Sequence, residues 1–280
     1  MTSPMNGPDN PYDGTHLDSR DPRYVSAWLP VAELFARLYF RVRTTGVENV
    51  PPQNPVIFVG NHSGGLGTPD TAMAVHAFWS HWGVHRPVFA LVHPNIFKMP
   101  RMAKHIARLG GLAATPRMAQ AVMDARAAML IYPGAGYEAY RPHGERGLVK
   151  LGDRSGYVRL AMRYGAPIVP VVCHGGHDTL IVLDDGRERA AALGLDKLGM
   201  DQLPLTYSWP FGLALGSFYS LPFPARIDVA FGDPIRFDGF SASDWRDRHL
   251  VEWCHRHVEQ RMQTMLDTLV AGRESDQAGR

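Results

Sequence analysis

One histidine surrounded by glycines is the first feature of this sequence that could do chemistry. The stretch VIFVGNHSGGLGTPDTAM (56–73) runs from an apolar segment, 56–60, into a loop that carries His62 and several glycines. A helix start is signalled only afterwards, at Thr68-Pro69-Asp70. An imidazole titrates near neutral pH and is suited to proton transfer, so this loop is a candidate site. The same residues also fit a tight strand-to-helix turn in which His62 merely packs.

Several familiar catalytic motifs are absent from the chain. GNHSGG is not a nucleophile elbow, because Asn61 stands where that motif requires glycine. No phosphate-binding G-x-x-x-x-G-K-[ST] sequence occurs. The segment CHGGHD (173–178) offers sulfur, imidazole and carboxylate ligands, but its spacing matches no standard zinc pattern. We therefore expect no metal.

Composition narrows the class of protein. The 280 residues suffice for one large α/β domain, and the formal net charge of +2 does not suggest a nucleic-acid binder. Two cysteines cannot form a disulfide framework, which indicates a reducing compartment. Residues 1–22 lack the pattern of a signal peptide and are rich in Pro, Asn, Asp and Gly, so we predict a disordered tail.

Strands and helices alternate along the rest of the chain. Apolar runs predict strands at 56–60, 88–92, 128–132, 167–172 and 227–231. Helical spacing predicts helices at 24–42, 69–82, 97–109, 117–127 and 154–164, and a last helix that opens at Ser241 or Ser243 and stops near Gly272. This alternation is typical of a single α/β domain, with a mostly parallel sheet flanked by helices, an N-terminal amphipathic helix and a C-terminal helix. We set the domain at 23–272, followed by a flexible end, 273–280.

Three loops are expected at one edge of this sheet. They follow the strands at 56–60, 128–132 and 167–172, and carry His62, GAGYEAYRPHGER (134–146) and CHGGHD. Sites in parallel sheets lie beyond the carboxyl ends of the strands. Between Asp70 and Asp124 the chain has no Asp or Glu but several basic residues, among them Arg117. Such a segment can attract an anionic ligand such as a coenzyme A phosphate, an acidic carrier protein or a lipid headgroup.

The segment QLPLTYSWPFGLALGSFYSLPFPA (202–225) is uncharged and rich in aromatic residues. Its prolines and glycines exclude a membrane-spanning helix. We predict an irregular apolar loop that lies on a bilayer or lines a lipid groove, and an ordinary buried loop is the alternative.

Four blocks in order resemble the glycerolipid acyltransferase superfamily. They are GNHSGG…PD (60–70), RLGGLAATPR (108–117), IYPGAGYE (131–138) and GAPIVPVVCHGGHDTL (165–180). The superfamily includes lysophosphatidate and glycerol-3-phosphate acyltransferases, and the stretch 156–171 is most similar to the diacylglycerol-acyltransferase-like branch. The resemblance covers roughly residues 50–235.

The resemblance implies that His62 is the general base and that Asp70 orients it. In the family the two residues form H-x-x-x-x-D, whereas here seven residues separate them. Asp70 also fits a helix-start role, in which its carboxylate stabilises the helix dipole. An H-x-x-x-x-D sequence does occur at His16–Asp21, but it lies in the predicted tail and we regard it as chance.

The block matching 131–138 implies the site of the acyl acceptor. Phosphate-acceptor enzymes have F-P-E-G there, whereas the Gly-x-Gly-x-Glu of this chain resembles the branch that uses neutral lipid acceptors. Backbone N–H groups of the glycine loop can stabilise an oxyanion, and Asn61 can fix that loop. The expected substrate-binding residues are therefore Asn61, Ser63, Gly64, Gly65, Arg117, Pro133, Gly134, Gly136, Glu138 and Arg141.

The resemblance implies an O-acyltransferase of lipid metabolism, including phospholipid biosynthesis. It would move a fatty acyl group from acyl-CoA or acyl carrier protein to a lipid hydroxyl and would need no cofactor. We expect it to work as a peripheral protein at the cytoplasmic face of a membrane. A lipid esterase that uses His62, with Ser63 or water, and a non-catalytic lipid-binding module are the alternatives.

Overall fold

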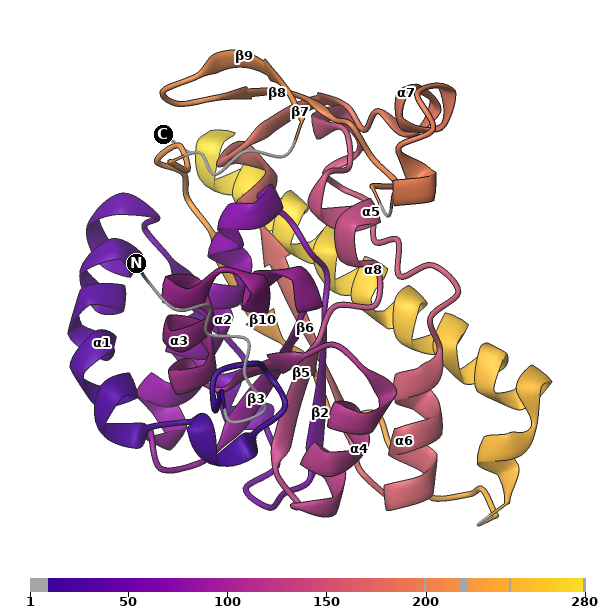
Figure 1. Ribbon diagram of the computed structural model, residues 1–280. Helices are drawn as coiled ribbons and strands as arrows, with labels where there is room; N and C mark the ends of the chain where they lie inside the picture. The colour runs from indigo at the N-terminus through magenta and orange to yellow at the C-terminus, as the bar shows by residue number, and fades with distance from the viewer. Residues whose placement is uncertain (1–9, 199, 217–220, 242, 279–280) are drawn as a thin grey trace.

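Seven strands form one sheet at the centre of the molecule (Figure 1), in the order β1-β10-β6-β2-β5-β3-β4. The computed structural model describes residues 10–198, 200–216, 221–241 and 243–278. Five neighbouring strands, from β6 to β4, are parallel, β10 is antiparallel to β6, and β1 is parallel to β10. The bounds are β1 Arg43–Thr45, β2 Val56–Gly60, β3 Val88–Val92, β4 Gly111–Ala113, β5 Ala128–Ile131, β6 Ile168–His174 and β10 Asp228–Phe231.

Helices cover both faces of this sheet (Figure 1). They are α1 Pro22–Leu34, α2 Pro69–Trp82, α3 Pro100–Leu109, α4 Pro116–Asp124, α5 Ala135–Ala139, α6 Gly156–Tyr164, α7 Arg187–Ala192 and α8 Arg248–Ala278. A π-helical turn, Phe35–Tyr39, continues α1. The predicted single α/β domain with a mostly parallel sheet is confirmed, because each of the five predicted strands is a strand of this sheet.

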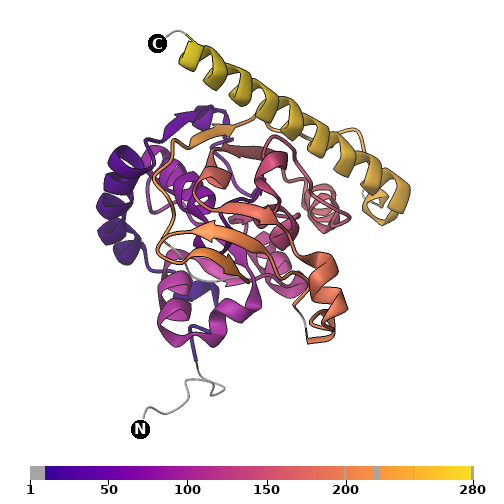
Figure 2. The ribbon, with the colours of Figure 1, turned by 90° about the horizontal axis from the view of Figure 1, so that it is seen from above.

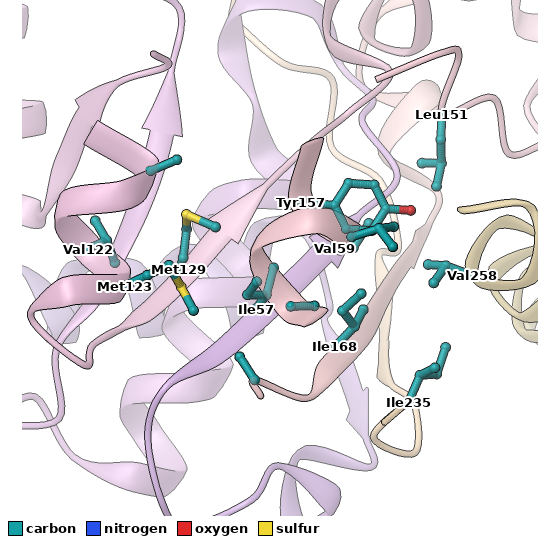
Figure 3. Close-up of a cluster of buried hydrophobic side chains, with 14 of the residues drawn as sticks. Ile57, Val59, Val122, Met123, Met129, Leu151, Tyr157, Ile168, Ile235 and Val258 are labelled. Carbon is teal, nitrogen blue, oxygen red and sulfur yellow. The ribbon is translucent and has the colours of Figure 1, made fainter. Parts of the chain in front are cut away.

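Strand β2 shows why the sheet is buried on both sides. All five of its residues are buried. Ile57 and Val59 join a core with residues of α4, α6 and α8 (Figure 3), whereas Val56 and Phe58 join a second core with α1 and α2. A strand without a polar face is therefore fixed at the centre of the molecule, and it ends where the glycine loop begins.

A second, three-stranded antiparallel sheet contains β7 Ile181–Asp184, β8 Leu205–Ser208 and β9 Gly212–Leu215. It lies beyond the carboxyl ends of the parallel strands, and it overlies them when the molecule is seen from above (Figure 2). The prediction of an irregular loop over 202–225 is thus wrong for residues 205–215. Pro204 and Pro210 lie outside the strands, one before β8 and one in its turn, so neither blocks the pairing.

Both ends of the chain differ from the prediction. The last helix begins at Arg248, where Asp247 accepts the N–H groups of His249 and Leu250, and not at Ser241 or Ser243. It continues beyond Gly272 to Ala278. Residues 10–22, assigned to a tail, pack on the domain, since Gly14 accepts the Ala113 N–H and Arg20 donates to the Val84 carbonyl. Residues 1–9 lie outside the described part.

Candidate active site

The end of β2 is tied to its neighbouring strands before the chain reaches His62. A Cβ on Gly60 would come within 2.3 Å of the Tyr132 ring, so only glycine fits. Asn61 accepts the Cys173 N–H at 2.7 Å and donates to the Cys173 carbonyl at 2.9 Å. This buried amide links the end of β2 to β6, so the next residue, His62, leaves the sheet from a fixed position.

His62 and Asp70 form a buried pair. The His62 Nδ1 atom lies 2.8 Å from Asp70 Oδ2, and the Asp70 side chain is fully buried. Because a carboxylate only accepts, Nδ1 carries the proton, which leaves the Nε2 lone pair to accept another. The His62 side chain is 14% exposed. An imidazole held in this way is a candidate general base, with the carboxylate as the group that orients it.

The glycine loop accommodates the longer spacing between these two residues. Gly64 and Gly65 have φ of +78° and +60°, and the chain then makes a 3₁₀ turn, Gly65–Gly67, before α2 starts at Pro69. Such φ values strain any residue that has a Cβ. Asp70, the second residue of α2, is thereby returned to the end of β2 and also accepts the Ser63 N–H at 2.7 Å.

Electrostatics increase the basicity of His62. Burial alone would lower the pKa of His62, but the Asp70 charge and hydrogen bond, together with the Glu138 charge, outweigh it and raise this pKa. Tyr132 stacks on the imidazole with ring centroids 4.5 Å apart. Sequence reasoning missed Tyr132 as a site residue, although its position as the last residue of the strand predicted at 128–132 was a usable signal.

Glu138 holds the backbone of His62 in place. Its Oε2 accepts the His62 N–H at 3.1 Å, and its Oε1 accepts the Lys150 N–H at 3.0 Å and lies 3.4 Å from Arg141 Nη1. Burial raises the pKa of Glu138 to about 7, against the opposing charge of Arg141 and the two backbone donors. Glu138 and Arg141 are fully buried or nearly so, and their contacts are internal.

Arg141 extends this network to His177. Its Nη2 lies 3.0 Å from His177 Nε2, which must accept the bond. Burial and the Arg141 charge lower the pKa of His177 well below its usual value, so His177 is neutral. Within the part of the chain that the structure describes, Arg141 Nε and His177 Nδ1 have no partner. Both atoms are buried donors of this network that are left without an acceptor among the described residues.

The other predicted substrate-binding residues of the block 131–138 determine the path of the backbone there. A Cβ on Gly134 would come within 2.5 Å of the Lys150 carbonyl, and one on Gly136 within 2.9 Å of Gln202 Oε1. The Pro133 carbonyl accepts from Arg154 at 3.1 Å. Glycine is thus required at 134 for the chain to approach Lys150, whose N–H reaches Glu138.

Two N–H groups of the glycine loop have no backbone acceptor among the described residues. The Ser63 N–H donates to Asp70, and Ser63 itself is buried. Among the described residues, the N–H groups of Gly64 and Gly65 donate to no loop, turn or cap acceptor. They lie two and three residues after His62, which makes them candidate donors to a tetrahedral intermediate.

The structure does not bring Arg117 to this site. Arg117 is exposed in the first turn of α4, after the edge strand β4. Three strand spacings separate β4 from β2, about 14 Å along the sheet edge. The His16–Asp21 motif is not a site either, since Asp21 caps α1 and pairs with Arg108 at 2.7 Å, while His16 lies 3.9 Å from Asp13.

The CHGGHD segment is dispersed over several partners. His177 contacts Arg141, and Asp178 pairs with His143 and Arg273. Across the described ranges, no three His, Cys, Asp or Glu side chains converge in a way that could hold a metal ion. Those ranges also contain no helix that is long and apolar enough to cross a membrane.

Comparisons with known proteins identify the family of this chain. The sequence model of the family described as diacylglycerol acyltransferase matches residues 17–262. This match spans most of the sequence, and the chain belongs to that family. The protein is accordingly an acyltransferase of lipid metabolism.

The individual proteins that this chain resembles share less than 30% sequence identity with it. An uncharacterized protein of Mycobacterium tuberculosis is 28% identical over 261 residues, which cover 91% of this chain and 69% of the relative. Phytyl ester synthase 2, chloroplastic, of Arabidopsis thaliana is 27% identical over 82% of this chain and 34% of its own length. The crystal structure of the 1-acyl-sn-glycerophosphate acyltransferase PlsC from Thermotoga maritima matches 86% of this chain and 83% of its own, at 19% identity and a TM-score of 0.47.

Proposed function

We propose that the protein transfers a fatty acyl group from an acyl thioester, acyl-CoA or acyl carrier protein, to the hydroxyl of a neutral lipid alcohol. The observation that carries this proposal is the 2.8 Å contact between His62 and Asp70 at the end of β2. Family membership supplies the class of reaction. We further propose that the protein acts peripherally at the cytoplasmic face of a membrane.

The proposed chemistry assigns one step to each group. His62 Nε2 takes the hydroxyl proton as the hydroxyl oxygen attacks the thioester carbonyl. The N–H groups of Gly64 and Gly65 stabilise the resulting oxyanion, and Asp70 stabilises the imidazolium. The C–S bond then breaks, and the imidazolium proton passes to the departing thiolate. The products are an ester and a free thiol.

A neutral acceptor is supported by two observations. Arg141, the basic residue closest to the acceptor block in the sequence, is buried and paired with Glu138, so its charge is already compensated. The Arabidopsis relative is named for the synthesis of phytyl esters, which implies a long-chain alcohol as its acceptor. A phosphorylated acceptor would need a cation that is free to bind phosphate.

One assay tests the proposal. The protein is incubated with a labelled acyl-CoA, and separately with acyl carrier protein, in the presence of diacylglycerol, a long-chain alcohol, a lysophosphatidate or no acceptor. We expect labelled ester with a neutral acceptor. Label in free fatty acid alone would indicate a hydrolase, no turnover would indicate a binding module, and transfer confined to lysophosphatidate would contradict the neutral acceptor.

A further inference from the structure

The small sheet has its polar and apolar sides reversed. On the side that faces the domain, Val182, Thr206 and Ser208 are buried. On the other side, Tyr207 and Leu213 are paired across β8 and β9 and both are more than half exposed. A sheet with one solvated face normally places its polar residues outside. Here two polar residues face inward and large apolar ones face outward.

Helix α1 and its π-helical turn repeat this reversal. Val31, Leu34, Phe35 and Leu38 lie on one stripe at helical spacing, and all four are about half exposed or more. The small Ala32 and Ala36 are buried instead. A surface helix ordinarily turns its larger apolar residues toward the core.

These two surfaces are joined. The Tyr39 hydroxyl donates to the Pro222 carbonyl at 2.6 Å, and the next residue, Phe223, stacks on Tyr207 of β8 with ring centroids 5.9 Å apart. We call the outer side of β8 and β9, its turn and the exposed stripe of α1 the apolar face. Trp209 and Phe211, at the turn between β8 and β9, are both exposed.

The apolar face lies beside the site, at the edge of the sheet that also carries three exposed cations without an ion pair to any described residue. Leu180, directly before β7, contacts the glycine loop. A Cβ added to Gly65 would lie only 2.5 Å from the Leu180 side chain. Lys98, Arg101 and Arg117 follow the carboxyl ends of β3 and β4, and all three are exposed. None of the ion pairs formed between described residues includes them.

We propose that the apolar face docks the protein on a bilayer that contains anionic lipid. The proposal rests on the lipid substrates of the proposed function. Exposed apolar side chains that include aromatic residues fit the membrane interface, and the three cations attract anionic headgroups. A two-fold contact between copies of the chain would bring like charges together, whereas headgroups neutralise them.

The test measures partition into phosphatidylcholine vesicles with and without phosphatidylglycerol. The variant Trp209→Ser/Phe211→Ser/Leu213→Ser is expected to bind both vesicles at least about tenfold more weakly. The single change Trp209→Ser gives a smaller loss in the same direction if the triple variant folds poorly. The matched control is Trp253→Ser, because Trp253 on α8 is 56% exposed, as is Trp209, and lies away from the apolar face. It should bind like the wild type.

Two further variants separate the parts of the proposal. Lys98→Gln/Arg101→Gln should weaken binding to vesicles with phosphatidylglycerol and leave binding to phosphatidylcholine alone unchanged. His62→Ala should bind vesicles normally, so normal docking without acyl transfer by the wild type would refute the proposed function and not the docking. The docking proposal is overturned if the triple variant binds like the wild type, if Trp253→Ser is equally impaired, or if the triple change only converts a dimer into a monomer.

Discussion

The glycine loop and the apolar face depart from the usual distribution of residues in opposite directions. Around the loop, Asp70, Glu138 and Arg141 carry charge in the interior. On the apolar face, Trp209 and Leu213 expose more than half of their surface. Each of these buried charges lies beside a partner within the chain, Asp70 beside His62 and Glu138 beside Arg141, so the fold itself accounts for them. The exposed apolar residues of this face are accounted for instead by the membrane docking that we propose.

The largest expected effect is at the centre of the loop. His62→Ala should lower acyl transfer by about 10²–10⁴-fold, because a positioned base contributes that much, while the protein stays folded. Turnover under saturating thioester, with circular dichroism as a check of the fold, measures this. His16→Ala is the control and should leave turnover unchanged. If the His62→Ala variant were fully active, the glycine loop would have only a structural role.

Asp70→Asn tests whether a buried charge acts on His62. Removing the carboxylate removes the charge that raises the pKa of His62, so the acidic limb of the pH–rate profile should move to lower pH. Turnover should fall at least about tenfold, because the imidazolium loses its partner. A helix-start role alone predicts instead a loss of about 0.3–1 kcal/mol in stability and an unmoved profile.

Glu138→Gln should mainly affect stability. Both carboxylate oxygens accept backbone N–H groups, and an amide can accept only at one, so the free energy of unfolding should fall by about 1–3 kcal/mol. Urea denaturation at several pH values measures this.

The same measurements test the sign of the pH dependence. The pKa of Glu138 in the folded protein, about 7, lies above the ordinary value of 4.5. The stability from this group is therefore complete below about pH 4.5 and is lost as the pH rises through 7. The difference in the free energy of unfolding between the wild type and Glu138→Gln should therefore become smaller from pH 5 to pH 8. Glu188→Gln, at an exposed carboxyl outside this network, is the control, and a difference that widens with pH would contradict the assignment.

The smallest effect is expected on the apolar face. Leu213→Thr should change the free energy of unfolding by no more than about 0.5 kcal/mol, because the side chain is already exposed. Val182→Thr on the inner side of the same sheet should cost about 1–3 kcal/mol, since it buries a hydroxyl. Equal losses for the two would mean that the outer side is covered within the protein.

Much of the fold could be predicted from local patterns. The bounds predicted for β2, β3 and α2 agree with the structure, because continuous apolar runs and Thr-Pro-Asp are strong local signals. The strands β1 and β4 have three residues each and were missed, since so short a run leaves no period to detect. The β8–β9 hairpin was missed because its alternation places apolar residues on the exposed side.

The amino-acid sequence by itself determined that a histidine, glycines and an aspartate follow a buried strand of an α/β sheet. Only the tertiary structure decided which groups they meet. Seven residues separate His62 from Asp70, and their sequence does not show that the two side chains lie 2.8 Å apart. This contact forms because two glycines of the loop adopt left-handed conformations. The partnership of Glu138 with the His62 N–H joins positions 76 residues apart. Such contacts form when strands that are distant in the sequence pair in the sheet. They therefore cannot be predicted from the sequence around either residue.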